Sequence, residues 1–114
     1  MAKDRTPKVN ALMKKELGQI LLREVEAPEG AFMTLTRVDA SPNLQQAKVY
    51  ISVMPEDKAN AVLKVLSQNI YEVQQILNAR LKMRPVPKIK WVLETATSEA
   101  QRIEELLDEI KRKK

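Results

Sequence analysis

The sequence contains neither cysteine nor histidine among its 114 residues. Their absence excludes disulfides, thiolate nucleophiles, imidazole bases and the zinc sites that these two residue types form. Glycine is also scarce, with only Gly18 and Gly30 present, so the chain cannot form a phosphate-binding loop of the P-loop or dinucleotide-binding type. Carboxylate pairs such as Glu104 and Asp108 have the helical spacing of a solvated face rather than that of an acid–base dyad. We therefore expect a protein that is not an enzyme and that needs no cofactor or metal.

Long apolar runs are missing as well. No stretch approaches the roughly 18 residues needed to span a bilayer, and the N-terminal residues lack the uninterrupted apolar segment of a secretory signal. We therefore expect a cytoplasmic protein without a membrane partner. A chain of 114 residues has room for one compact domain, which we expect at residues 1–95, followed by a helical extension at 96–114.

What the sequence does contain is an excess of basic residues. Its formal net charge is +5, and the first 95 residues hold the whole excess, with fifteen basic and ten acidic side chains. A moderately basic small domain suggests a polyanionic partner, usually nucleic acid. Charge that serves solubility alone is the alternative.

Apolar residues at three- and four-residue steps predict three helical segments. The first begins near Thr6, which can act as the N-cap, has Pro7 in its first turn and ends at about Glu24. The second covers residues 56–83, and the third follows Ser98 near the C-terminus.

The middle of the second helical segment is weak. Ser67 and Asn69 flank Gln68 there, and their side chains compete with the backbone for hydrogen bonds. A kink that divides the segment into two helices is compatible with these residues. One continuous helix whose polar residues face water is equally compatible with the propensities.

Threonine and other β-favouring side chains predict a strand at residues 32–40, and alternation of apolar and polar side chains predicts strands at 46–54 and 88–94. The turn residues SPNL between the first two strands indicate an antiparallel hairpin. Pro85 and Pro87 end the second helical segment and impose extended backbone before the third strand.

The predicted element order is α-β-β-α-(kink)-α-β with an added C-terminal helix, which is the order of a type II KH domain, an RNA-binding fold. We expect a two-layer α+β domain whose helices cover one face of the sheet. Trp91 shares the register of Ile89 and Leu93, so we expect it in the core rather than stacked on a base. KH domains normally clamp the nucleic-acid backbone with a GXXG loop. That clamp is excluded here because no glycine follows Gly30.

Three segments resemble the bacterial ribosome-binding factor A family: KKELGQILLREV, MTLTRVDASPNLQQAKVYISVMPE and RLKMRPVPKIKWVLETATSEAQRIEELLDEI. The resemblance covers residues 7–110, and its most specific part is VDASPNLQQAKVYISV followed by VPKIKWVLE. It implies a KH-like protein that binds the immature small ribosomal subunit, contacts its ribosomal RNA and assists late maturation (rRNA processing), often under cold stress.

The family's Ala-x-Gly kink matches Ser67-Gln68-Asn69 here, which is a departure from the family pattern. Asn tolerates the left-handed conformation that Gly adopts, so the bend could survive at Asn69. Ser67 and Asn69 could then donate side-chain hydrogen bonds to phosphate or ribose.

Basic side chains on a common surface would neutralise phosphates and release counterions when RNA binds. Arg80 and Arg84 share a helical face by their spacing, with Lys82 well round from it. Lys88 and Lys90 share one side of the third strand, and a second cluster lies on the first helix. For each residue, a solvated charge without a binding role is the alternative. The predicted RNA-binding residues are Arg5, Lys8, Lys15, Ser67, Asn69, Arg80, Lys82, Arg84, Lys88 and Lys90.

The partner that the resemblance implies is the small ribosomal subunit with its rRNA, and we expect it to be bound by a monomer that takes no small-molecule substrate. The alternative is a protein-interaction module that docks on a ribosomal protein or an assembly GTPase through the open sheet face or the terminal helix. Salt dependence separates the two, because contacts with phosphates weaken strongly as the salt concentration rises.

Overall fold

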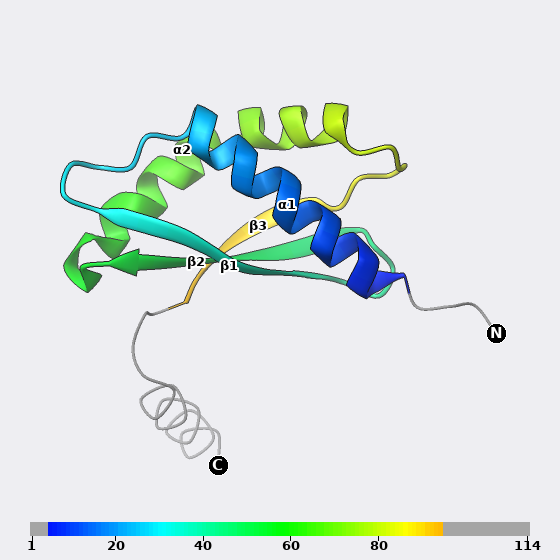
Figure 1. The fold of residues 1–114 in the computed structure, drawn as a ribbon, viewed down its shortest axis with the longest axis horizontal. Coiled ribbons are helices and arrows are strands. Elements are labelled where there is room, and N and C mark those ends of the chain that lie inside the picture. Colours follow the sequence, from blue (N-terminus) through cyan, green and yellow to red (C-terminus); the bar gives the residue numbers. More distant parts are fainter. Residues whose placement is uncertain (1–4, 95–114) are drawn as a thin grey trace, which may run out of the picture.

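The computed structural model describes residues 5–94. Two helices lie on one face of a three-stranded sheet, which confirms the predicted two-layer α+β arrangement (Figure 1). The elements are α1 (Thr6–Glu24), β1 (Phe32–Ala40), β2 (Gln46–Met54), the short 3-10 helix η1 (Glu56–Lys58), α2 (Ala59–Arg80) and β3 (Lys88–Leu93). The first two strands have the predicted bounds, and β3 ends one residue earlier than expected. The helical extension predicted at 96–114 lies outside the described residues.

β2 is the central strand of the sheet. It pairs antiparallel with β1 and parallel with β3, so the predicted hairpin is confirmed. Its turn contains Leu44, whose φ of 58° is left-handed and whose N–H donates to the Ser41 carbonyl at 2.8 Å. A parallel pair needs a long crossover connection, and α2 provides it between β2 and β3. β1 and β3 therefore form the two edges of the sheet.

α1 ends at Glu24, as predicted. Its N-cap is Arg5 rather than Thr6, and no side-chain hydrogen bond caps the helix there. The prediction that Thr6 is the cap is therefore wrong by one residue. Pro7 is tolerated throughout the first helical turn because the N–H groups of that turn have no partner within the helix, so the helix can begin before the proline.

α2 is one continuous helix, so of the two alternatives that the sequence left open, the helix is not divided into two. Among the described residues only Gly30 and Leu44 have a positive φ, and Asn69 therefore keeps right-handed helical geometry. The axis of α2 nevertheless changes direction near its middle (Figure 1). There the Asn69 side-chain N–H₂ donates to the Val65 carbonyl at 2.8 Å. A side chain that bonds to the carbonyl four residues earlier competes with the helix ladder and favours bending.

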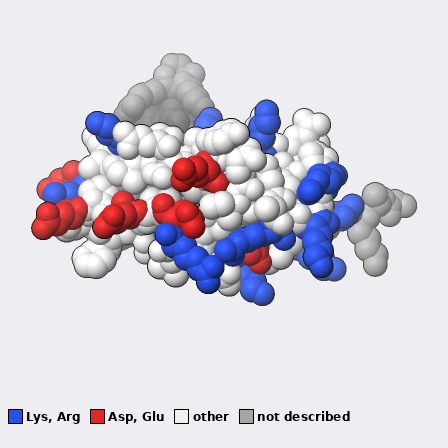
Figure 2. Space-filling model, turned by 90° about the horizontal axis from the view of Figure 1, so that it is seen from above, with Lys and Arg blue, Asp and Glu red and all other residues white. Residues whose placement is uncertain are grey.

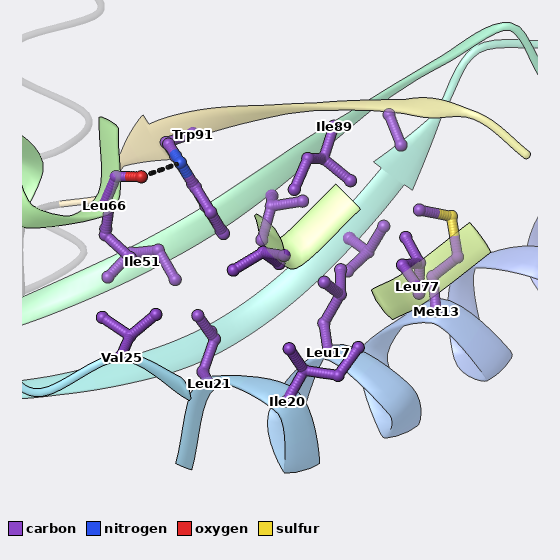
Figure 3. Packing of buried hydrophobic residues seen from close by; sticks show 14 of the residues in the cluster. Met13, Leu17, Ile20, Leu21, Val25, Ile51, Leu66, Leu77, Ile89 and Trp91 are labelled. Carbon is purple, nitrogen blue, oxygen red and sulfur yellow. Dashed lines mark hydrogen bonds between the residues drawn. The ribbon is translucent and has the colours of Figure 1, made fainter. Parts of the chain in front are cut away.

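The core lies between the two helices and the covered face of the sheet (Figure 3). Met13 and Leu17 of α1 and Ile51 of β2 belong to this core, and all three are fully buried. Trp91 is 9% exposed, and its indole N–H donates to the Leu66 carbonyl at 2.9 Å (Figure 3). The prediction that Trp91 belongs to the core is confirmed, and its hydrogen bond reaches α2 beside the bend.

Candidate nucleic-acid interface

Charge is distributed unevenly along the molecule. Seen from the helix side, basic side chains gather toward one end and acidic side chains toward the other (Figure 2). We call the basic end the part formed by the start of α1, residues 81–87 and the start of β3. We call the acidic end the part formed by residues 25–31 and η1. Because the ends carry opposite charge, a polyanion will approach the basic end first.

Two basic clusters that are far apart in the sequence meet at the basic end. Arg5 at the N-cap of α1, Lys8 of α1 and Lys82 after α2 line one hollow of ≈ 200 Å³, together with the apolar side chains of Val9, Leu12 and Met83. Arg5, Lys8 and Lys82 are all exposed to solvent. We refer to this feature as the basic hollow. It offers three positive charges around an apolar floor, which suits a phosphate beside a ribose or base.

A second cavity, of ≈ 450 Å³, separates the last turns of α2 from residues 84–88. It combines two positive charges with side-chain amides, and we call it the amide groove. Its lining residues are Gln74, Gln75, Asn78, Arg84, Pro85, Val86 and Lys88. Amide and guanidinium groups together can bind phosphate oxygens and base edges.

Gln74 positions this groove, and the sequence did not single it out. Its side-chain N–H₂ donates to the Pro87 carbonyl at 3.1 Å, and its side-chain oxygen accepts from the Ile89 N–H at 2.8 Å. These backbone groups flank Lys88, whose own N–H donates to the Gln45 carbonyl at 2.9 Å. The proline pair could have pointed to such a residue. Prolines impose an extended segment, and the backbone groups of a segment outside helices and strands need hydrogen bonds from side chains.

The side chain of Arg80 points toward α1 and not toward Arg84. Its guanidinium lies 3.3 Å from the Glu16 carboxylate and donates to the Gln19 side-chain oxygen at 3.1 Å. The Arg80 side chain is 27% exposed. The prediction that Arg80 and Arg84 share a helical face is wrong, because α2 ends at Arg80 and Arg84 lies in the following connection. Arg80 therefore joins the two helices.

Lys88 and Lys90 lie on the open face of the sheet, as their spacing predicted, and both are exposed. Lys90 pairs with Lys48 of β2, a basic residue absent from the predicted set. Like charges directly opposite each other destabilise a sheet. Such a pair on an exposed face is consistent with an anionic partner that neutralises both charges.

The middle of the open face is internally paired. Arg37 lies 3.9 Å above the centre of the Tyr50 ring and 3.9 Å from the Glu94 carboxylate. Thr36, at the β-bulge of β1, donates to Glu94 at 2.5 Å. These contacts leave the Arg37 side chain 50% exposed, but its charge is partly neutralised within the sheet.

Three further predicted residues stand apart from both cavities. Lys15 and Ser67 are exposed, and Asn69 uses its amide N–H₂ for the Val65 carbonyl. None of the three lines the basic hollow or the amide groove. The structure thus brings together Arg5, Lys8 and Lys82 in one cavity and Arg84 and Lys88 in another.

The described part of the chain contains no cluster of acidic side chains able to hold a metal ion. Within the same residues, neither helix has an apolar stretch long enough to cross a bilayer. The cations and side-chain amides of the basic end can neutralise negative charge and form hydrogen bonds.

Comparison with known proteins identifies the fold. The family model for ribosome-binding factor A matches residues 5–107. The crystal structure of ribosome-binding factor A from Thermus thermophilus is similar, with 21% identity, coverage of 77% of this chain and 94% of that chain, and a TM-score of 0.64. The solution structure of a ribosome-binding factor A candidate from Thermotoga maritima has 22% identity, coverage of 86% and 95%, and a TM-score of 0.65.

A third similar structure is a homology model of the Thermus thermophilus factor, fitted into the cryo-EM map of its complex with the 30S subunit. It shares 24% identity, the match covers 71% of this chain and 90% of that chain, and the TM-score is 0.53. All three likenesses show the same arrangement of helices and strands.

Proposed function

Because the chain belongs to the ribosome-binding factor A family, we propose that it binds the immature small ribosomal subunit and contacts its ribosomal RNA. In this proposal the protein assists late maturation, including rRNA processing and growth in the cold. It acts in the cytoplasm as a monomer. The observation that carries the RNA contact is the meeting of Arg5, Lys8 and Lys82 in one hollow beside the amide groove. The placement of a homologue in a 30S complex supports the choice of particle.

We further propose that the domain is a type II KH domain that binds RNA without the usual backbone clamp. The order of helices and strands supports this assignment. Interior N–H groups of a continuous helix are bonded to its own carbonyls, and α2 runs unbroken through Ser67 and Asn69. Side chains, rather than backbone N–H groups inside α2, then supply the contacts there, and exposed cations at the basic end are available for RNA.

Salt dependence provides the test of the RNA contact. We expect the affinity for purified immature small subunits to fall with salt with a log–log slope of about −4 if about five phosphates are contacted. A flat response would instead favour docking on a ribosomal protein or an assembly GTPase.

A matched pair of double variants locates the contact. Lys82→Ala/Lys88→Ala removes two exposed charges at the basic end, and it should weaken binding and reduce the slope by about 1.5. Arg23→Ala/Lys64→Ala removes two exposed charges elsewhere and should leave the slope unchanged. Equal losses in both double variants would contradict binding through the basic end.

A further inference from the structure

The acidic end contains an apolar hollow that the proposed RNA contacts do not use. Its volume is ≈ 460 Å³, and it lies between the second half of α1 and the first half of β1. Among its lining residues are Leu21, Leu22, Val25, Phe32, Met33 and Leu35. Leu22 is 88% exposed and Phe32 is 75% exposed. Large apolar side chains that gather around a cavity and remain in water are typical of an interaction site.

The hollow reaches around the outer edge of β1. Successive residues of a strand point to opposite faces of its sheet, yet Phe32 and Thr34 on one face and Met33 and Leu35 on the other all line the hollow. A cavity that is reached from both faces lies beside the edge of the strand. Among residues 5–94, β1 pairs with β2 alone. Its outer backbone groups can therefore accept an extended peptide as an additional strand.

The length of edge that a partner can use is limited by the β-bulge. The regular register of β1 is interrupted between Leu35 and Arg37, and a bulge breaks the regular spacing of hydrogen-bonding groups along a strand. The segment that is both regular and next to the hollow is residues 32–35. An added strand would therefore be short, and its affinity must come largely from side chains.

The charge around the hollow selects the kind of side chain. Glu24, Glu26 and Glu29 are exposed and are interspersed with the lining residues Val25 and Ala27. The η1 segment contributes two more exposed acids, and its Lys58 side chain lies beside Gly30 in the connection after α1, where the exposed acids outnumber this one lysine. Figure 2 shows the resulting concentration of acidic side chains at this end. A basic partner is therefore favoured over an acidic one.

We propose that the free edge of β1 and the apolar hollow bind an extended, basic segment of another protein. The segment adds a short strand beside residues 32–35, places an apolar side chain in the hollow and directs its lysines or arginines toward the surrounding acids. This surface is separate from the basic end, so the inference does not rest on the proposed RNA contact.

Three synthetic heptapeptides test the chemistry of the partner against the full chain. The first alternates lysine with valine or isoleucine, the second replaces its lysines with glutamate, and the third replaces its apolar residues with serine. We expect calorimetry to detect binding of the first and binding at least tenfold weaker for the other two. Amide NMR signals of residues 22–35 should shift on binding. Equal binding of the glutamate peptide, or shifts confined to the basic end, would overturn the proposal.

Matched variants test the location. Leu22→Lys and Phe32→Lys each remove an exposed apolar contact and add a repelling charge, and each should weaken binding of the first peptide at least tenfold with an unchanged melting temperature. Tyr71→Lys adds the same charge at a side chain on α2 that is 72% exposed, and it should alter binding less than twofold. Equal loss in all three variants would show that net charge governs binding and would refute the site.

Sedimentation and subunit binding complete the test. If the wild-type protein self-associates and Phe32→Lys abolishes the self-association, a second copy occupies the edge and the proposal is overturned. The proposal expects the wild-type protein to sediment as a monomer. Small-subunit binding of Leu22→Lys is measured in parallel. A protein that binds the peptide but no small subunit would contradict the proposed function and leave this inference standing.

Discussion

The basic and acidic ends differ in what they present to a partner as well as in charge. At the basic end, Gln74 fixes the backbone before β3, and next to this end Arg80 holds the last turn of α2 against α1. At the acidic end, Leu22 and Phe32 project into water beside a strand edge. A fixed frame suits cations that must match the spacing of phosphates, whereas an open edge suits a segment that takes up its shape on binding. We therefore expect the basic residues to bind a partner from fixed positions, and the acidic residues to attract a partner that adapts to the strand edge.

Replacement of Trp91 should impair both the basic end and the acidic end, because the same core supports both. We expect Trp91→Ala to lower the free energy of unfolding by about 3–5 kcal/mol, with loss of both small-subunit and peptide binding. Urea denaturation followed by circular dichroism measures the change. Tyr71→Ala, at an exposed aromatic side chain, should change stability by less than about 0.5 kcal/mol. Survival of full stability in Trp91→Ala would show that the core does not depend on the indole.

Replacement of Gln74 should affect only the basic end. Gln74→Leu leaves the Pro87 carbonyl and the Ile89 N–H without their side-chain partner, which should reduce the free energy of unfolding by about 1–3 kcal/mol. Small-subunit binding should weaken because Lys88 loses its fixed position, whereas binding of the basic peptide should persist. Gln75→Leu, at an exposed neighbouring position, is the stability control. A parallel loss of peptide binding would mean that the two ends are coupled.

Arg80 and Arg84 are close in the sequence but differ in their contacts, since Arg80 pairs with Glu16 and Arg84 lines the amide groove. Variants of the two therefore test whether these contacts determine the role of each residue in stability or in binding. Arg80→Ala should lower the free energy of unfolding by about 1 kcal/mol because its partly exposed ion pair is lost, and it should change small-subunit affinity less than twofold. Arg84→Ala should weaken that affinity several-fold with a stability change within about 0.5 kcal/mol. Denaturation and binding titrations on both variants measure the contrast. A larger binding loss in Arg80→Ala would reverse the assignment.

The smallest effect is expected on the open face of the sheet. Lys90→Glu replaces a like-charge cross-strand pair with an attractive pair to Lys48, which should stabilise the fold by about 0.5 kcal/mol. The same change should weaken small-subunit binding. Thermal melting measures the expected gain in stability, and titration measures the expected loss of small-subunit affinity. Lys90→Gln should give intermediate values of both. A destabilised Lys90→Glu would show that Lys90 does not repel Lys48.

Features set by neighbours in the sequence could be predicted well. The bounds of β1 followed from its β-favouring side chains, those of β2 from alternation, and the break between them from the turn residues around Leu44. The end of α1 at Glu24 preceded Pro28 and Gly30, which interrupt the helical pattern. The burial of Trp91 followed from its register. In each case a local pattern and the global fold require the same conformation, as is usual in natural sequences.

Features set by distant contacts could not be predicted. Arg80 contacts Glu16 across 64 positions, and Lys82 lines the same hollow as Arg5 only because the connection after α2 returns to the start of α1. Spacing alone placed Arg80 beside Arg84 because it assumed that the helix continued. Helix propensity could not decide whether α2 continues through Asn69. Packing of the flanking apolar residues decides it, because packing outweighs propensity differences of this size.

The parallel pairing of β3 has a consequence for the order of assembly. The hairpin of β1 and β2 closes over a short turn, whereas β3 must return after the whole of α2, as the pairing of Ala47 with Ile89 shows. Long closures are entropically costly and tend to form late. The basic end, which is completed by residues 81–88, should therefore appear in the final step of folding. A nascent or partly folded chain would then lack the complete surface on which the proposed RNA contact depends, and only the completed domain would compete for the subunit.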